Sequence, residues 1–317
     1  MRTIKKVASH IFIDGFGGMT QGLFATLIIG TMIQQIGLLI GGSTGNVIYL
    51  LGKAAAALTS AGIGVGVAVK YGESPLVTVS AAVAAMVGGY AGKITGGTFF
   101  VDGNAVLAGP GEPLGAFIAA FAGITCGHLV SGKTKVDIIV TPVITIGAGS
   151  VVGLLVGPPI SQMMTGLGSI INWATEQRPF IMGIVVSVVM GMVLTLPISS
   201  AALGIILNLS GLAAGAATIG CCCNMVGFAV ASYRENKFGG LVAQGLGTSM
   251  LQVPNIMRHP LIWLPVIFSS AILGPVSTIL ANMQNNATGS GIRDIIYLMT
   301  ELLIAPEKEQ IAAEGCT

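Results

Sequence analysis

The sequence predicts an all-α membrane protein, a polytopic bundle of about 9–10 membrane segments with two inverted repeats and re-entrant or broken helices. Of its 317 residues, 53% are hydrophobic and only 8% are charged, and the mean hydropathy is +0.88. A soluble domain of ordinary composition carries about 25% charged residues. The chain also has 47 glycines and only 6% aromatic residues, which favours closely packed, interrupted helices over a barrel of alternating polarity.

Apolar runs separated by brief polar intervals fill the chain, so we expect a single membrane domain over residues 1–317. Several runs have about 16 residues, fewer than the ~20 that span the hydrocarbon core, which indicates half-helices or re-entrant hairpins. The runs lie at 11–40, 47–69, 76–92, 113–131, 137–157, 180–208, 211–232, 239–254 and 260–282, with a weaker one at 294–304.

The spacing of glycines indicates an internal duplication. Gly22 and Gly30 in GLFATLIIG have the same spacing as Gly183 and Gly191 in GIVVSVVMG. The predicted repeats cover approximately 11–157 and 170–304. If each repeat contributes an odd number of membrane elements, the second copy is inverted relative to the first. The alternative is that glycine-rich apolar helices resemble one another by composition alone.

The stretch from Thr95 to Gly115, TGGTFFVDGNAVLAGPGEPLG, concentrates polar groups in an apolar chain. It contains Asp102, Asn104 and Glu112. Irregular backbone at the depth of a bilayer must be covered by protein or line a wet cavity, and a carboxylate there costs roughly 2.5–3.5 kcal/mol. The stretch is therefore a candidate binding loop, although Asp102 and Asn104 fit an ordinary turn equally well because DG and GN are turn dipeptides.

Glu112 and His259 are the leading candidate site residues. Each precedes a proline that begins an apolar helix, in EPLGAFIAAF and HPLIWLPVIF. Proline is favourable in a first helical turn and holds the residue before it extended, so each side chain is presented at a helix N-terminus. Across a pseudo-two-fold axis the two would face each other and bind a hydroxylated or anionic small solute. Alternatively, they lie at opposite membrane surfaces as helix caps.

Three further polar residues, Gln244, Gln252 and Asn255, interrupt the short apolar run GLVAQGLGTSMLQVPN. They are secondary candidates for solute binding, because such side chains also bond neighbouring helices. We expect 240–258, like 95–112, to form broken or re-entrant structure within the membrane.

Loop charges give weak support for an orientation with the N-terminus inside. This orientation leaves Arg234 and Lys237 outside, on the side opposite Lys70, Lys133 and Arg258.

The cysteines do not form a metal-binding pattern. Three of the five are consecutive, at Cys221, Cys222 and Cys223, and neighbouring helical residues point about 100° apart, so they cannot chelate one ion from a regular helix. We expect them to be packing residues, and we expect neither a metal nor a cofactor.

We expect no enzymatic activity from this chain. It contains no HExxH pattern, and we expect the segment GGSTG at 41–45 to be a loop between helices. Basic residues are too few and too scattered for nucleic-acid binding.

The whole chain resembles the enzyme IIC-like membrane proteins of the bacterial sugar phosphotransferase system, in particular a small stand-alone branch that includes the perfringolysin O regulator. The residues that carry the resemblance are DGFGGMTQGLFATLIIGT at 14–31, GPGEPLGAF at 109–117, GCCCNMVGFAVASYRENKFGGLVAQGLGTSMLQVPNI at 220–256 and HPLIWLPVIF at 259–268. The resemblance implies a homodimer in the bacterial plasma membrane that carries a sugar for phosphorylation by a partner. It also implies that Glu112 and His259 contact the sugar.

Two functions fit this resemblance. The first is a permease for a small polar solute, working with separate cytoplasmic IIA- and IIB-type proteins because the sequence contains no such domain. The second is a membrane sensor that binds a ligand and signals through a partner without net transport, as the regulator-like relatives imply. The brief loops offer little surface for a signalling partner, which favours transport.

Overall fold

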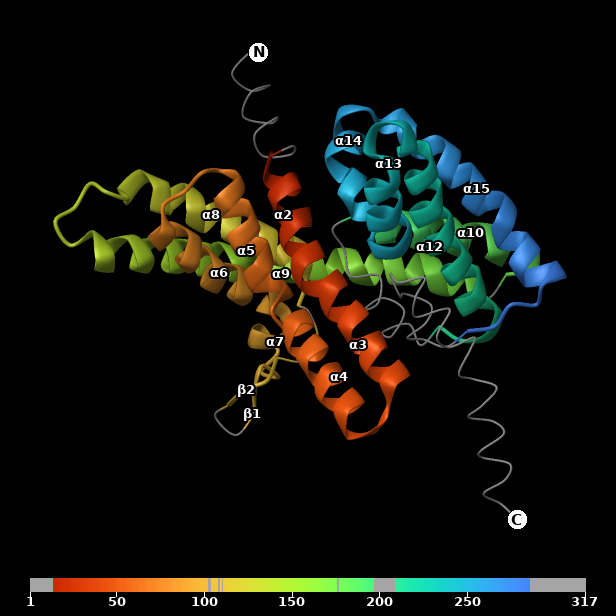
Figure 1. The fold of residues 1–317 in the computed structure, drawn as a ribbon, viewed down its shortest axis with the longest axis horizontal. Coiled ribbons are helices and arrows are strands. Elements are labelled where there is room, and N and C mark those ends of the chain that lie inside the picture. The colour runs from red at the N-terminus through yellow and green to blue at the C-terminus, as the bar shows by residue number, and fades with distance from the viewer. Residues whose placement is uncertain are drawn as a thin grey trace.

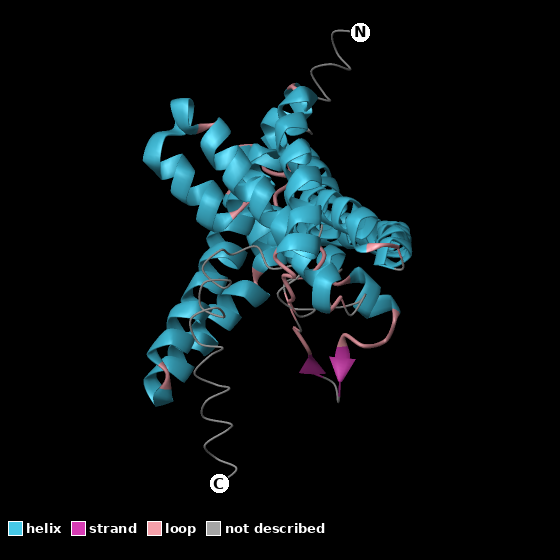
Figure 2. Ribbon diagram, turned by 90° about the vertical axis from the view of Figure 1, so that its right-hand side faces the viewer, coloured by secondary structure: helices cyan, strands magenta, loops and turns pink. Residues whose placement is uncertain are grey.

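The computed structural model describes residues 14–101, 104–107, 109, 111–175, 177–196 and 209–285. These residues are almost entirely helical (Figures 1 and 2). The predicted weak segment at 294–304 lies outside them, as does Asp102.

Eleven elements are described before residue 176. In order they are α2 (Phe16–Leu23), η2 (Phe24–Ile28), α3 (Ile29–Ile40), α4 (Gly42–Ala57), α5 (Thr59–Lys70), α6 (Pro75–Gly89), α7 (Ala91–Thr95), the strands β1 (Phe100–Val101) and β2 (Asn104–Ala105), α8 (Pro113–Val130) and the long α9 (Asp137–Thr175), where η2 is a π-helical turn that continues α2 into α3.

The part after residue 176 is more interrupted. Its described elements are α10 (Pro179–Thr195), α12 (Gly211–Ala231), α13 (Tyr233–Val242), η3 (Ala243–Gly247), η4 (Ser249–Gln252), α14 (Val253–Arg258), η5 (Pro260–Trp263), α15 (Leu264–Pro275) and η6 (Val276–Leu280).

Five helices of the described chain are long and apolar enough to cross a membrane, and they cover Phe16–Ile40, Pro113–Val130, Asp137–Gly157, Gly211–Ala231 and Pro260–Leu280. The pair α4 and α5, bent by 53°, makes a sixth if it is counted as one span, and α6 and α10 are shorter apolar helices. The prediction of a helical multi-pass membrane protein is confirmed. The run at 239–254 is broken into short elements, as the sequence predicted for 240–258.

Close contacts between glycines join the first helices. Gly18 and Gly22 on α2 lie against Gly66 and Gly62 on α5, and a Cβ atom at any of these positions would crowd the partner helix. Small residues allow this approach where lipid provides no hydrophobic force between helices.

Two large apolar clusters lie in the interior. One joins α2, α5, α6 and α8 with Met250 and Val253 from the second half, and the other joins the end of α9 with α10 and α12. Because Met250 and Val253 are buried in the first cluster, the broken part of the second half is packed against the first half.

The inverted repeat remains a prediction. The aligned glycines make different contacts, since Gly22 lies against Gly62 on α5 whereas Gly183 lies against Gly274 on α15.

The segment after α7 leaves the helical pattern and forms a short hairpin. The strands β1 and β2 pair Phe100 with Ala105 in an antiparallel hairpin that projects from the helices (Figure 1), and residues 104–107 are exposed. The free edges of so short a hairpin need water or a covering partner. The stretch is thus broken, as expected, and its turn dipeptides let it pair with itself outside the helical body. Its depth in the membrane remains a prediction.

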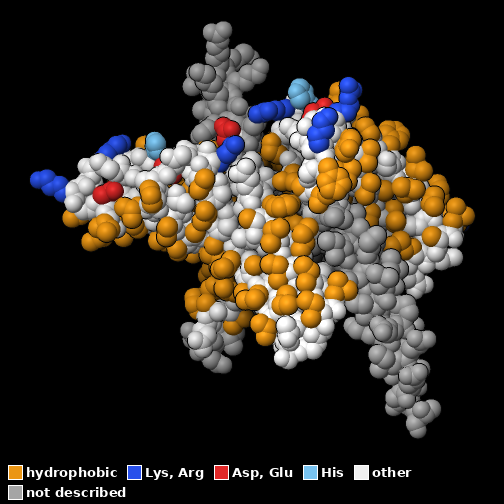
Figure 3. All heavy atoms as spheres, viewed as in Figure 1, with side chains coloured by type: hydrophobic (Ala, Val, Ile, Leu, Met, Phe, Trp, Pro, Cys, Tyr) orange, Lys and Arg blue, Asp and Glu red, His pale blue; other side chains and the backbone are white. Residues whose placement is uncertain are grey.

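Charged side chains gather along the upper and left side of the molecule in Figure 3, which we call the charged edge. The loops 71–74 and 131–136, together with α13 and α14, lie along it (Figure 1). The exposed cations of these elements and their ends are Lys70, Lys133, Lys135, Arg234, Lys237 and Arg258. The positive-inside rule predicts that this edge is the cytoplasmic one. The assignment of Arg234 and Lys237 to the opposite side was wrong, because the chain between α13 and α14 returns to the same edge.

Candidate functional site

Residues 233–258 form a re-entrant segment, whose two ends lie at the charged edge (Figure 1). The helix α13 is kinked at Lys237, whose φ of 52° lies in a region that residues other than glycine rarely adopt. The π-helical η3 follows, and then Thr248 is extended and its hydroxyl accepts a hydrogen bond from the backbone N–H of Met250. Glycine, threonine and proline thus break the helix repeatedly, as the sequence predicted for 240–258.

Four polar side chains of this region form one line of hydrogen bonds, which we call the amide chain. Gln244 donates from Nε2 to Ser232 Oγ at 2.9 Å, and Gln252 donates from Nε2 to Gln244 Oε1 at 2.9 Å. Asn255 donates from Nδ2 to Gln252 Oε1 at 2.8 Å. The structure therefore brings three of the sequence-predicted site residues together.

The amide chain runs from the surface into the interior. Asn255 is exposed, whereas Gln252 and Gln244 are 5% and 3% exposed. Each primary amide has two N–H donors and a carbonyl oxygen with two lone pairs, so these bonds leave donor and acceptor capacity unused. The amide chain carries no formal charge, so its side chains can exchange hydrogen bonds with a neutral hydroxylated molecule.

A second polar group, the Asn224 hub, lies deeper. Asn224 on α12 is fully buried. Its Oδ1 accepts from Thr195 Oγ1 at 3.1 Å and from Trp263 Nε1 at 3.3 Å, and its Nδ2 donates to Ser270 Oγ at 3.3 Å. The Thr195 hydroxyl also pairs with Ser249 on η4 at 3.0 Å. The hub thus ties the re-entrant segment to α10, α12 and α15.

Sequence reasoning missed the hub. The available signal was Asn224 itself, an isolated amide in the apolar stretch GCCCNMVG, because a polar side chain inside a membrane helix usually bonds another helix or marks a site.

The cysteines beside the hub contribute packing. Cys221 and Cys223 are buried and Cys222 is half-buried. The described residues contain no group of three His, Cys, Asp or Glu side chains that could hold a metal ion.

Glu112 begins a helix as predicted. It is the residue before Pro113 at the start of α8, in an extended conformation, and its N–H donates to the carbonyl of Gly89 at 2.7 Å. Its side chain is half-buried, with Oε1 inside the protein. The Tyr90 hydroxyl donates to the carbonyl of Gly109, which holds the preceding loop against α6.

His259 occupies a different environment. It joins α14 to η5, donates its N–H to the Asn255 carbonyl at 2.8 Å and is exposed near the charged edge. The facing arrangement of His259 and Glu112 remains a prediction. Asn104 is exposed on β2, in the projecting hairpin.

The family model described as phosphotransferase system, EIIC, matches residues 13–300, which is nearly the whole chain. The chain belongs to this family. No curated protein matches the sequence.

Membership of the EIIC family indicates the general function of the protein, which is that of a membrane permease component. EIIC domains are membrane permease components that transport solutes and work with cytoplasmic IIA and IIB components. The apolar helices of this EIIC protein fit that role, since they make it a multi-pass membrane protein. The perfringolysin O regulator branch stays a prediction.

Proposed function

We propose that this EIIC protein carries a small hydroxylated solute such as a sugar across the bacterial plasma membrane, and that Gln244, Gln252 and Asn255 bind it. The observation that supports the proposal is the amide chain, in which all three residues are linked within a broken segment that opens at the charged edge. Broken helices near the middle of a membrane protein are the usual place for transporter sites.

The chemistry of the amide chain favours a neutral polyol. A sugar hydroxyl donates one hydrogen bond and accepts others, as a primary amide does, so each amide–amide bond can be replaced by two amide–hydroxyl bonds. Because the amides are nearly excluded from water, a molecule that cannot replace their hydrogen bonds would leave buried groups unsatisfied, at about 1–3 kcal/mol each. This penalty would discriminate against apolar analogues of similar size.

The remaining components follow from the family. We propose that separate IIA- and IIB-type proteins phosphorylate the solute, that the EIIC chain itself catalyses no reaction, and that it works as a homodimer. The charged edge, with Arg234, Lys237 and Arg258 beside the mouth of the re-entrant segment, offers a cytoplasmic surface to these partners.

The test begins with a screen of the purified protein against monosaccharides, disaccharides and sugar alcohols by thermal shift. A ligand at ten times its Kd stabilises the folded state by about 1.4 kcal/mol. The stabilising compound is then used in radiolabelled binding and proteoliposome uptake. We expect Gln252→Ala to weaken its binding by about 5- to 150-fold.

A control is Gln34→Ala on α3, which likewise removes a side-chain amide. The Nε2 of Gln34 donates to the carbonyl of Gly30 at 3.3 Å. Gln34→Ala should leave the affinity unchanged. Equal affinities in the Gln252→Ala variant and the wild type would refute the site. Binding without uptake, alone or with the IIA and IIB proteins, would favour the sensor over the permease.

A further inference from the structure

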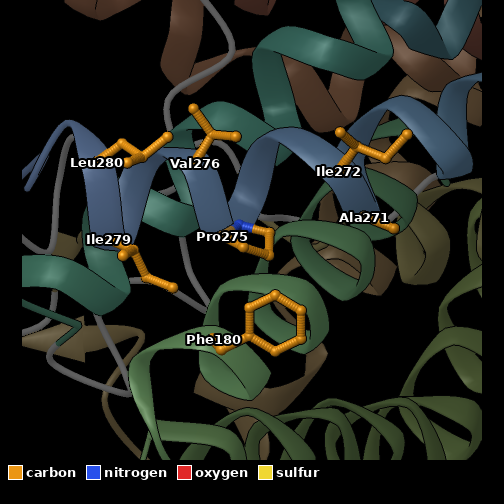
Figure 4. Close-up of a pocket in the computed structure, with 7 residues that line it drawn as sticks. All are labelled: Phe180, Ala271, Ile272, Pro275, Val276, Ile279 and Leu280. Carbon is orange, nitrogen blue, oxygen red and sulfur yellow. The ribbon is translucent and has the colours of Figure 1, made fainter.

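An apolar groove of about 410 Å³ lies at the end of α15 farthest from α14. The ring of Phe180 on α10 forms one side, and Pro275 and Ile279 point toward it from the opposite side (Figure 4). All of its lining side chains are apolar: Phe180, Ala271, Ile272, Pro275, Val276, Ile279 and Leu280. A polar solute would find no hydrogen-bond partner among them, so the groove is separate from the proposed solute site.

The groove has the length of one leaflet. Its lining runs along the helix from Ala271 to Leu280, which at 1.5 Å per residue is about 14 Å, close to half of the ~30 Å hydrocarbon core. The groove lies at the C-terminal end of the candidate span Pro260–Leu280. The N-terminal end of this span lies beside α14 at the charged edge. The groove therefore opens to the hydrocarbon of the leaflet opposite that edge.

The residues beside the groove define the membrane surface at this end. Arg178 directly precedes α10, is exposed and forms no ion pair with any described residue. Trp173, 55% exposed in the last turn of α9, is close to it in sequence. Tryptophan and arginine together are typical of the level of the lipid headgroups.

A hydrogen bond fixes this cation relative to the groove. Thr278 on η6 donates from Oγ1 to the carbonyl of Pro179 at 2.9 Å, so the first turn of α10 is tied to the wall of the groove. Arg178 and Phe180 are the two sequence neighbours of Pro179. The positive charge of Arg178 therefore lies at one end of the apolar groove. A molecule with one anionic end and one long apolar end complements this arrangement.

We propose that the groove holds an acyl chain of an anionic phospholipid of the bilayer, with its phosphate at Arg178. Acyl chains are as apolar in the bilayer as in the groove, so burial alone gives little selectivity. Selectivity comes from the headgroup: one cation near the membrane surface favours an anionic over a zwitterionic lipid by about fivefold.

Native mass spectrometry of the purified full-length protein tests the proposal. The protein is titrated with phosphatidylglycerol and with phosphatidylcholine of identical acyl chains. The wild type should retain phosphatidylglycerol about fivefold better. Arg178→Gln removes the charge, and Ala271→Phe fills the groove with a ring. Both substitutions should reduce the preference to about one. If Ala271→Phe does not fold, Ile279→Trp fills the same space.

Two matched controls lie on α4. Lys53→Gln removes another exposed cation, and Ala54→Phe adds a ring at an exposed position. Both should keep the wild-type preference. The proposal is overturned by equal retention of the two lipids in the wild type, or by a preference that survives Ala271→Phe, which would mean a headgroup contact without an acyl chain in the groove. It is also overturned if Ala271→Phe dissociates a dimer without changing lipid retention, because the groove would then be a subunit interface.

Discussion

Gln252 donates a hydrogen bond from Nε2 to Oε1 of Gln244 at 2.9 Å, across the break between η3 and η4. The two residues lie on separate short elements, yet both are nearly fully buried. Their bond closes a loop of the re-entrant segment and is the central link of the amide chain. A solute that inserts between the two amides would therefore act on the conformation of the whole segment.

Separate and combined removal of these amides should show that they are coupled. We expect Gln244→Ala and Gln252→Ala each to lower the free energy of unfolding by about 1–3 kcal/mol, with a coupling energy of about 0.5–1.5 kcal/mol in the double variant. Unfolding in detergent mixtures measures all three. Asn46→Ala, at an exposed position on α4, should change stability by less than about 0.5 kcal/mol. Fully additive effects of the two glutamine substitutions would contradict the bond.

The Asn224 hub should matter more for stability than its neighbours on the same helix. Asn224→Leu leaves the Trp263 N–H and the hydroxyls of Thr195 and Ser270 without a common partner, so we expect a loss of about 1–3 kcal/mol or more. Cys222→Ala, two positions earlier and half-buried, should cost less than about 1 kcal/mol and leave solute affinity within about threefold. Equal stability of the two variants would show that the hub does not hold the helices together.

Close approach of α10 and α12 gives a third prediction. A Cβ at Gly220 would clash with the backbone of Ser187, whereas Gly147 on α9 has no neighbouring atom in the way. Gly220→Ala should therefore destabilise the protein by about 1–3 kcal/mol. Gly147→Ala should be neutral or stabilising by up to about 1 kcal/mol, because alanine favours a helix more than glycine does. Thermal unfolding of both variants distinguishes them, and the opposite order would refute the packing.

Glu112 and His259 provide a fourth prediction, which rests on the sequence and the family. If both contact the solute, Glu112→Gln and His259→Ala should each weaken binding by roughly 10- to 150-fold through loss of charge-assisted hydrogen bonds. The measurement is the same radiolabelled titration used for Gln252→Ala. Unchanged affinity in both variants would remove the pair from the site and leave the amide chain unaffected.

The fold class and the position of the helix break were predictable from the sequence, since both depend on composition and on local residue preferences. Few charges and many apolar runs identified a multi-pass helical protein. The glycines, Pro254 and the polar residues of this stretch predicted that 240–258 cannot form one uninterrupted helix. The same short stretch contained Gln244, Gln252 and Asn255, so their proximity followed from sequence distance.

Contacts between distant elements were not predictable in the same way. Thr195, Ser249 and Ser270 are ordinary small polar residues in sequence, and only packing of α10, η4 and α15 brings them to Asn224. The conformation of the loop after α7 was also not predictable, because turn dipeptides are compatible with a buried break and with an exposed hairpin. The direction in which α13 and α14 run also depends on tertiary packing, and loop charges alone assigned Arg234 to the wrong side.

A structure of the protein with its bound solute, determined by cryo-electron microscopy after the ligand screen, tests the central claim most directly. The account predicts solute density within hydrogen-bond distance of at least two of Gln244, Gln252 and Asn255, with the Gln244–Gln252 bond opened or replaced. Density for the solute elsewhere in the protein, with the amide chain intact as described, would contradict it.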